Sequence, residues 1–558
     1  MHSNNGGDMS EPKVPDYLQK LKPDPNRGRE IDFQSPGERA PGITKRSNTT
    51  RWIGFALGLV LALAAFFLLP QEMPHNARLT AATALLMACW WMSEALPIPA
   101  TALMPLVIFP TLSEALPDEE GELVRIGFDS VGASYGNNVI FLFLGGFLLA
   151  LSMQRWNLHR RIALLVLRVM PNKPGAMIGG FMIATGFLSM WVSNTATAVM
   201  MLPIGMSVLA LVHQVTGQSP DAERGSTTRE ESAAVDIGAA IKSNFGTALM
   251  LGIAYAASLG SLGTLIGTPP NAFLAGYMSQ NFDFTIGFGE WMIVGVPLSV
   301  VFLFIAWWLL VKVIFKPEMD EIPGGGELIR SELAKLGRMS RGEWLVLIVF
   351  AATATAWITI PLVASALDVE PWISDAGIAI LAGVILFLTP AGANRGVKLL
   401  DWKSAKELPW DVLLLFGGGL ALSAQFSDSG LTEAIGEFAA GMAGIPMILV
   451  IAILATAILF LTELTSNTAT AATFVPVSAG IALGMGVDPL LFAAPVALAA
   501  TCAFMLPVAT PPNAVAYGSG YVTIPQMVRG GFLLNLIGIV LITITAVTLL
   551  TWVFGIVY

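Results

Sequence analysis

A sequence of short, neutral, oxygen-bearing side chains occurs twice in this chain. Ser-Asn-Thr-Ala-Thr spans residues 193–197 and returns at 466–470. Gly-Thr-Pro-Pro-Asn follows the first copy at 267–271, and Ala-Thr-Pro-Pro-Asn follows the second at 509–513. Hydroxyls, the Asn carbonyl and the carbonyls freed where a helix breaks suit a hard cation such as Na⁺. The Asn amide, the Thr hydroxyl and helix N-termini can donate hydrogen bonds to a carboxylate.

The two copies keep one register. Asn467 lies 273 residues after Asn194, and the two Pro-Pro-Asn motifs lie 242 residues apart. The difference fits a charged insertion at 214–243 in the first half, interpreted as a cytoplasmic loop. The same 273-residue separation relates three further pairs: Ser189 and Thr462, Pro203 and Pro476, and Gly145 and Gly418. A duplicated polar motif that breaks helices at membrane depth is typical of transporters built from two related halves.

Packing alone is the alternative interpretation, because small and hydroxylated residues often serve only to bring membrane helices together. It would suffice for one Ser-Asn-Thr copy. Two copies in register, each with its own Pro-Pro-Asn motif, favour a binding site. The glycines at 145–146 and 417–419 are interpreted as close-packing points. Glu463 is an acid within an apolar segment, and such acids often have a function. Its first-half equivalent is Met190, so the motif does not require an acid there, which favours a structural role for the carboxylate.

Composition identifies the elements that must position these motifs. Of 558 residues, 54% are hydrophobic and only 12% charged, against about 25% charged in soluble domains. Continuous apolar runs reach the ~20 residues that a membrane crossing needs, which favours helices over a β-barrel. The only cysteines are Cys89 and Cys502, and the chain has four scattered histidines. A disulfide framework or a Cys/His metal site is therefore not expected.

The distribution of Lys and Arg predicts the topology. Basic and acidic loops alternate sides if the chain crosses the membrane about eleven times, with a cytoplasmic N-terminus and the C-terminus outside. Two of these predicted crossings are 136–168 and 410–440. The alternation requires 175–212 and 443–484 to enter and leave on the same side, as re-entrant hairpins with Ser-Asn-Thr at their tips. The hairpins would enter from opposite faces, which is an inverted repeat.

The predicted fold class is an all-α polytopic membrane protein of inverted-repeat architecture. Its expected parts are, in order, a disordered cytoplasmic tail at 1–50, the first span and first repeat at 52–316, a cytoplasmic linker at 317–342 and the second inverted repeat at 343–558. No Lys or Arg lies at 174–212 or at 407–527. The charge of an anionic substrate would then be met by dipoles, hydroxyls and co-bound cations, so cation and anion binding should be coupled.

The paired Ser-Asn-Thr tips and Pro-Pro-Asn loops resemble the divalent anion/sodium symporter family over about residues 52–558. The resemblance implies a homodimer in the cell inner (plasma) membrane, each protomer having a scaffold domain and a transport domain that moves as an elevator. It implies Na⁺ as the co-transported ion and two Na⁺ sites. The first site would comprise Ser189, Ser193, Asn194 and Gly267, and the second Thr462, Ser466, Asn467 and Ala509. Substrate would bind Asn194, Thr195, Asn467 and Thr468, with Thr268, Thr510 and Pro511 completing the pocket.

The function expected from the resemblance is Na⁺-coupled uptake of C4-dicarboxylates such as succinate, fumarate and malate. Charge arithmetic adds that two Na⁺ neutralise a dianion and a third makes transport electrogenic. The nearer alternative is an exchanger on the same fold that swaps dicarboxylates without Na⁺. A membrane enzyme would need a His, Cys or Asp cluster at membrane depth, which the sequence lacks, and a channel fits poorly with paired hairpins.

Overall fold

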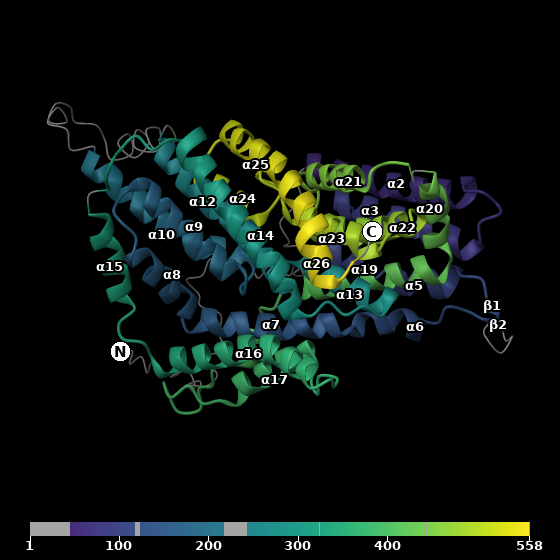
Figure 1. The fold of residues 1–558 in the computed structure, drawn as a ribbon, viewed down its shortest axis with the longest axis horizontal. Helices are drawn as coiled ribbons and strands as arrows, with labels where there is room; N and C mark the ends of the chain where they lie inside the picture. Colours follow the sequence, from purple (N-terminus) through teal and green to yellow (C-terminus); the bar gives the residue numbers. More distant parts are fainter. Residues whose placement is uncertain (1–44, 118–122, 217–242, 323, 442–443, 557–558) are drawn as a thin grey trace, which may run out of the picture. The chain divides into compact units, whose positions relative to one another are not determined.

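The computed structural model describes residues 45–117, 123–216, 243–322, 324–441 and 444–556. Residues 50–558 form one compact unit. The predicted tail at 1–50 lies almost entirely outside the described residues, and so does most of the predicted loop at 214–243. The described chain is helical (Figure 1), apart from one short antiparallel pairing of β1 (Leu116–Pro117) with β2 (Leu123–Val124).

The helices follow one another in three stretches. The first comprises α2 (Lys45–Leu68), α3 (His75–Ser93), α4 (Ile98–Thr101), α5 (Pro105–Leu112), α6 (Phe128–Ala133), the 3₁₀ turn η1 (Ser134–Gly136), α7 (Asn138–Arg155), α8 (Leu158–Arg168), α9 (Pro174–Ser189) and α10 (Asn194–Thr216). The second comprises α12 (Asn244–Ser261), α13 (Pro269–Phe282), α14 (Phe288–Trp308), the π-helical η3 (Leu309–Ile314), α15 (Gly325–Lys335), α16 (Arg341–Ala366) and α17 (Asp375–Leu388). The third comprises α18 (Trp402–Ala405), α19 (Trp410–Asp428), α20 (Leu431–Ala440), α21 (Met447–Thr462), α22 (Asn467–Gly484), α23 (Pro489–Thr501), α24 (Pro511–Gly518), α25 (Ile524–Thr545), the π-helical η4 (Ala546–Leu550) and α26 (Thr551–Phe554).

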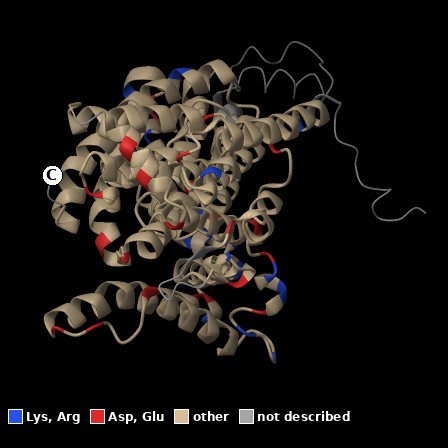
Figure 2. Cartoon of the chain, turned by 90° about the vertical axis from the view of Figure 1, so that its right-hand side faces the viewer, with Lys and Arg blue, Asp and Glu red and all other residues tan. Residues whose placement is uncertain are grey.

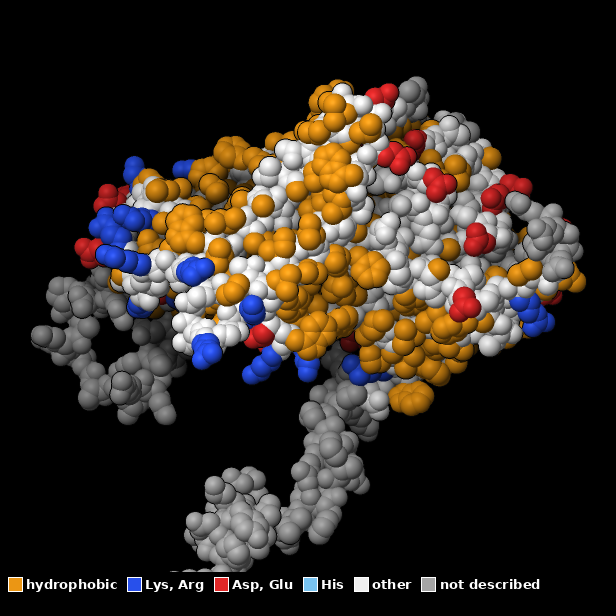
Figure 3. Space-filling model, turned by 90° about the horizontal axis from the view of Figure 1, so that it is seen from below, with side chains coloured by type: hydrophobic (Ala, Val, Ile, Leu, Met, Phe, Trp, Pro, Cys, Tyr) orange, Lys and Arg blue, Asp and Glu red, His pale blue; other side chains and the backbone are white. Residues whose placement is uncertain are grey.

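The fold is that of a polytopic helical membrane protein, as predicted. Seven helical stretches of the described chain are long and apolar enough to cross a membrane: Asn48–Leu68, Phe128–Arg155, Asn194–Val212, Phe288–Ile314, Arg341–Ala366, Trp410–Asp428 and Ile524–Phe554. Shorter apolar helices, α9 and α21 among them, accompany these. Charged residues are sparse along the helices (Figure 2), and apolar side chains cover much of the face seen in Figure 3.

Helix boundaries repeat at the separations found in the sequence. Both α9 and α21 have 16 residues, fewer than the ~20 of a full crossing. Their starts, their ends and the starts of α10 and α22 all differ by 273 residues. The starts of α13 and α24 differ by 242. Figure 1 shows the α9–α10 hairpin on the left of the view and the α21–α22 hairpin on the right.

Two predicted crossings each contain a break. The segment 136–168 divides into α7 and α8, with Asn157 in the left-handed region at φ 56°. The segment 410–440 divides into α19 and α20 at Gly430, whose φ is 80°. The predicted linker at 317–342 contains a helix, α15, that the sequence analysis did not anticipate.

The glycine motifs are close-packing points, as predicted. A Cβ on Gly145 would lie 2.4 Å from the backbone of Ala379 in α17. A Cβ on Gly418 would lie 2.1 Å from the carbonyl oxygen of Ala102, just after α4. Neither distance leaves room for a side chain, so α7 and α19 approach their neighbours at backbone contact.

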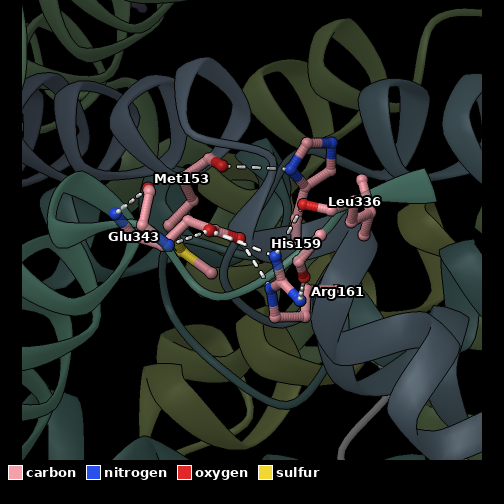
Figure 4. A network of polar contacts seen from close by, with 7 residues as sticks. Met153, His159, Arg161, Leu336 and Glu343 are labelled. Atoms are coloured by element: carbon pink, nitrogen blue, oxygen red, sulfur yellow. Dashed lines mark hydrogen bonds and ion pairs between the residues drawn. The ribbon is translucent and has the colours of Figure 1, made fainter. Parts of the chain in front are cut away.

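A buried ion pair joins α8 to the start of α16 (Figure 4). The Arg161 Nε donates to Glu343 Oε1 at 2.7 Å, and its two terminal nitrogens reach the carbonyls of Gly337 and Leu336 at 3.0 and 3.3 Å. Glu343 also accepts the Ser340 N–H at 2.7 Å. Because both side chains are nearly buried, at 10% and 6% exposed, this pair fixes α8 against the segment between α15 and α16.

Replacing Arg161 with Met should therefore destabilise the protein by about 3–5 kcal/mol, because Glu343 would remain buried without its partner. Glu94→Gln is the matched control. Its carboxylate is 64% exposed and pairs with Arg51 at 3.6 Å, so less than about 1 kcal/mol should be lost. Chemical unfolding of the detergent-solubilised protein measures both variants. Equal losses would contradict this assignment.

Candidate functional site

Both Ser-Asn-Thr copies lie at the turn between two consecutive helices, α9 and α10 for the first and α21 and α22 for the second. The second helix of each hairpin begins at the motif Asn, Asn194 in α10 and Asn467 in α22. The motif residues thus occupy the first turn, where backbone N–H groups have no partner within the helix. In the first copy, Ser193 Oγ accepts the Ala196 N–H at 3.3 Å and Asn194 Oδ1 accepts the Thr195 N–H at 2.8 Å.

One hydroxyl ties each hairpin to the broken helix that follows it. The Ser189 Oγ donates to the carbonyl of Ala257 in α12 at 2.5 Å. At the equivalent position, Thr462 Oγ1 lies 2.9 Å from the carbonyl oxygen of Ala500 in α23 and 2.8 Å from Asn467 Oδ1. The paired hydroxyls therefore do the same work in both halves, and both are fully buried.

The Pro-Pro-Asn motifs stabilise the two helix breaks. The Asn271 amide donates to the carbonyls of Leu262 and Thr264 at 3.3 and 3.0 Å. The Asn513 amide donates to the carbonyls of Ala503 and Leu506, both at 3.1 Å. Each Asn thus closes the loop that precedes it. The two side-chain oxygens, Oδ1 of Asn271 and of Asn513, are buried with no hydrogen-bond partner among the described residues.

The helix that begins at each Pro-Pro-Asn motif packs against the other half of the protein. Helix α13, which follows the first loop, packs against α22 and α23, and α24 packs against α10 and α12. The hydroxyls of Thr268 and Thr501 lie 3.4 Å apart across the halves. Each Pro-Pro-Asn helix therefore contacts the hairpin of the other half, which is how residues far apart in sequence contribute to one region.

The other predicted residues differ in exposure. Thr268, Thr468, Ala509 and Thr510 are buried, Pro511 is exposed, and Ser193, Asn194, Thr195, Ser466 and Asn467 are partly exposed. The Thr510 Oγ1 accepts the Asn513 N–H at 3.3 Å and so caps α24. Within the described residues no hydrogen bond is found between Asn194 and Asn467; α22 packs against α13, and α10 packs against α24.

The donor set fits a hard monovalent cation. Every predicted ligand offers a neutral oxygen from a hydroxyl, an amide or the backbone, and the two unpartnered Asn oxygens add unused acceptors at the same breaks. The described residues contain no group of three His, Cys, Asp or Glu side chains that could hold a metal ion. Asn271, Asn513 and Thr501 were not among the predicted site residues, although the first two belong to the repeated motif that marked the region.

Comparison with known families gives one extended match. The family described as "sodium:sulfate symporter transmembrane region" matches residues 49–556. The sodium-dependent dicarboxylate transporter SdcS of Staphylococcus saprophyticus is 40% identical over 518 residues, which are 92% of this chain and 94% of that protein. SdcS of Staphylococcus aureus strain MRSA252 is 41% identical over 514 residues, with the same coverage of both chains.

Two solved structures share the fold at low sequence identity. MtrF of Neisseria gonorrhoeae, described as illuminating a class of antimetabolite efflux pumps, is 14% identical with a TM-score of 0.50, covering 87% of this chain and 97% of its own. The YdaH transporter of Alcanivorax borkumensis is also 14% identical, with a TM-score of 0.53 and coverage of 84% and 98%.

Gly267 gives a direct test of the first break. A Cβ at this position would lie 2.3 Å from the carbonyl oxygen of Ser261, so Gly267→Ala must displace the backbone and should destabilise the protein by about 1–3 kcal/mol. Gly518→Ala is the control, because no atom lies within 4 Å of the added Cβ. Unfolding midpoints measure both variants. A tolerated Gly267→Ala would show that the loop is not constrained as described.

Proposed function

Because the chain belongs to the divalent anion/sodium symporter family, we propose that it couples Na⁺ influx to the uptake of C4-dicarboxylates such as succinate, fumarate and malate. Its relatives in Staphylococcus are named sodium-dependent dicarboxylate transporters, which supports both the cation and the substrate class. The family consists of transporters, so the alternative of a membrane enzyme is set aside.

The observation that carries the proposal is a pair of oxygen-lined helix breaks without a fixed positive charge. No Lys or Arg lies at 174–212, 243–311 or 407–528, the segments that contribute the hairpins and both loops. A dianion transferred from water to such a site would lose hydration that dipoles alone replace poorly. Sodium bound at the same breaks supplies the missing charge, so neither species binds well without the other.

We assign two Na⁺ sites and one substrate site on this basis. The first Na⁺ site comprises Ser189, Ser193, Asn194 and Gly267, and the second comprises Thr462, Ser466, Asn467 and Ala509. Substrate carboxylates meet Asn194, Thr195, Asn467 and Thr468, flanked by Thr268, Thr510 and Pro511. The N-termini of α10 and α22 begin at these motifs, and their dipoles favour an anion there.

The proposed movement is an elevator in which the two hairpins and α12, α13, α23 and α24 travel together. These helices pack on one another across the halves, which supports a single moving body. The halves have inverted topology in this proposal, and two protomers associate through their scaffold domains. On the face seen in Figure 3, Lys and Arg gather toward the end that carries α8 and α15, and Asp and Glu toward the other. The basic end is assigned to the cytoplasm.

Uptake of labelled succinate into empty proteoliposomes should require an inward Na⁺ gradient. Asn194→Ala and Asn467→Ala should each reduce this uptake at least about tenfold, since each removes an oxygen ligand and an amide donor worth more than ~1.4 kcal/mol together. Asn394→Ala, at an exposed position outside both motifs, is the control and should transport normally. Uptake only into dicarboxylate-loaded vesicles and indifferent to Na⁺ would instead identify the exchanger.

Transport should also respond to membrane potential. With three or more Na⁺ per dianion, at least one net charge enters per cycle, worth about 2.3 kcal/mol per 100 mV. An inside-negative potential of that size, set by K⁺ and valinomycin, should raise the equilibrium accumulation of succinate about fiftyfold. Accumulation unchanged by the potential would contradict a stoichiometry of three.

A further inference from the structure

Glu463 is a buried acid at the second hairpin tip, immediately after Thr462. It is 3% exposed, and its carboxylate accepts bonds from four groups. Oε1 accepts the N–H of Phe504 at 2.8 Å, the N–H of Met505 at 3.0 Å and the Asn535 amide at 2.7 Å; Oε2 accepts the N–H of Met505 and of Leu506, both at 3.1 Å.

Every partner of this carboxylate is a donor. An ionised carboxylate only accepts hydrogen bonds, whereas a protonated one must also donate its O–H. The surroundings therefore suit the charged form. Within the described residues the ion pairs do not include Glu463, so its negative charge is balanced by backbone and amide dipoles and not by a cation.

In the first half, two N–H groups of the matching loop bond to the helix before it and not to an acid. Met190 occupies the position equivalent to Glu463. The N–H groups of Leu262 and Gly263 bond back to the carbonyls of Leu259 and Gly260 in α12, at 3.4 and 3.0 Å. The first loop thus continues its helix with tighter turns. The second leaves the helix at Thr501 and depends on Glu463.

The loop that Glu463 holds leads directly to the second proposed Na⁺ site. Leu506, which donates its N–H to Glu463, accepts the Ala509 N–H at 3.2 Å through its carbonyl. The same carbonyl accepts from the Asn513 amide. Glu463 is therefore next to one proposed ligand, Thr462, and connected through Leu506 to another, Ala509.

We propose that Glu463 is a positioning residue for the second Na⁺ site, and that its charge makes this site bind Na⁺ more tightly than the first. The inference rests on the proposed function. A negative charge beside the site that is balanced by dipoles alone, with no cation paired to it, attracts Na⁺ and repels a dianion, because charges interact strongly where water is excluded. Sodium must then occupy the second site before substrate binds.

Sodium-dependent thermal stabilisation of the purified protein, without substrate, tests the proposal. Na⁺ is titrated against K⁺ at constant ionic strength, and the Na⁺ concentration for half-maximal stabilisation is measured. Glu463→Gln should raise this concentration about tenfold or more. Met190→Leu, an apolar exchange at the equivalent position, should change it less than about twofold. Equal shifts in these two variants would overturn the proposal.

Double variants locate the effect. If Glu463 serves the second site, Glu463→Gln should add no further shift when Asn467→Ala has already impaired that site. In the Asn194→Ala background the shift should persist in full, because independent sites contribute additively. A shift of the same size in both backgrounds would contradict the assignment to the second site.

Two further measurements keep the result interpretable. Glu463→Gln must elute as a monodisperse species in K⁺ to be interpreted. If it does not, Asn535→Ala takes its place, because it keeps the charge but removes one donor that holds the carboxylate in position. This variant should give a smaller shift in the same direction, and no shift would overturn the proposal. Wild-type protein that Na⁺ stabilises no better than K⁺ would refute the proposed Na⁺ coupling itself. A normal wild-type response with an unchanged Glu463→Gln would refute only the role of Glu463.

Discussion

The structure depends on how two helix breaks satisfy their backbone polar groups away from water. An unpaired N–H or carbonyl in an apolar surrounding costs several kcal/mol, so a broken membrane helix persists only where other groups replace the missing bonds. Asn271 and Asn513 do this by binding two loop carbonyls each. These bonds hold each broken segment to the Asn that follows it and leave the Asn side-chain oxygens without a partner among the described residues. This constraint supports the proposed cation sites, because the same breaks that must be stabilised also present unused acceptors.

The two halves have equivalent helix boundaries but differ in the hydrogen bonds that hold their loops. Helix boundaries recur at constant separations, and paired hydroxyls at Ser189 and Thr462 bind α12 and α23 in the same way. The backbone N–H groups at the two helix breaks have different acceptors. In the first half, those of Leu262 and Gly263 bond to carbonyls of α12. In the second half, those of Phe504 and Leu506 bond to the Glu463 carboxylate. In the proposed assignment, the duplicated helices thus carry two Na⁺ sites with different fixed charge nearby. Under the proposed function, this difference gives the binding steps an order that a symmetric pair could not impose.

The features that could be predicted from the sequence are those that a few neighbouring residues determine, such as where a helix breaks. The Pro-Pro-Asn motifs were interpreted as helix breaks, and α13 and α24 begin at these motifs. Contacts between distant residues left no such signal. Arg161 and Glu343 are 182 residues apart, Thr268 and Thr501 are 233 apart, and neither pairing follows from composition or spacing. The sequence did not predict helix α15, because its segment is charged and such a composition is typical of a loop. In the structure the helix packs on α8. The structural role favoured for Glu463 agrees with its contacts, but the loop that it holds could not be identified without coordinates.

A neutral binding site is an advantage for a coupled transporter. A lysine or arginine at the motifs would bind a dicarboxylate without Na⁺ and allow the loaded carrier to cross uncoupled. Under the proposed function, a site of neutral oxygens with a fixed negative charge nearby would disfavour the anion until Na⁺ arrives, since like charges repel and the helix dipoles contribute only ~0.3–2 kcal/mol each. The proposal gives the same repulsion a second role, in release at the cytoplasmic face. When Na⁺ leaves into a solution poor in Na⁺, the anion loses its counter-charge and is expelled. In this proposal the Glu463 carboxylate, which has no ion-pair partner among the described residues, opposes both premature binding and retention, and the Na⁺ gradient decides the direction.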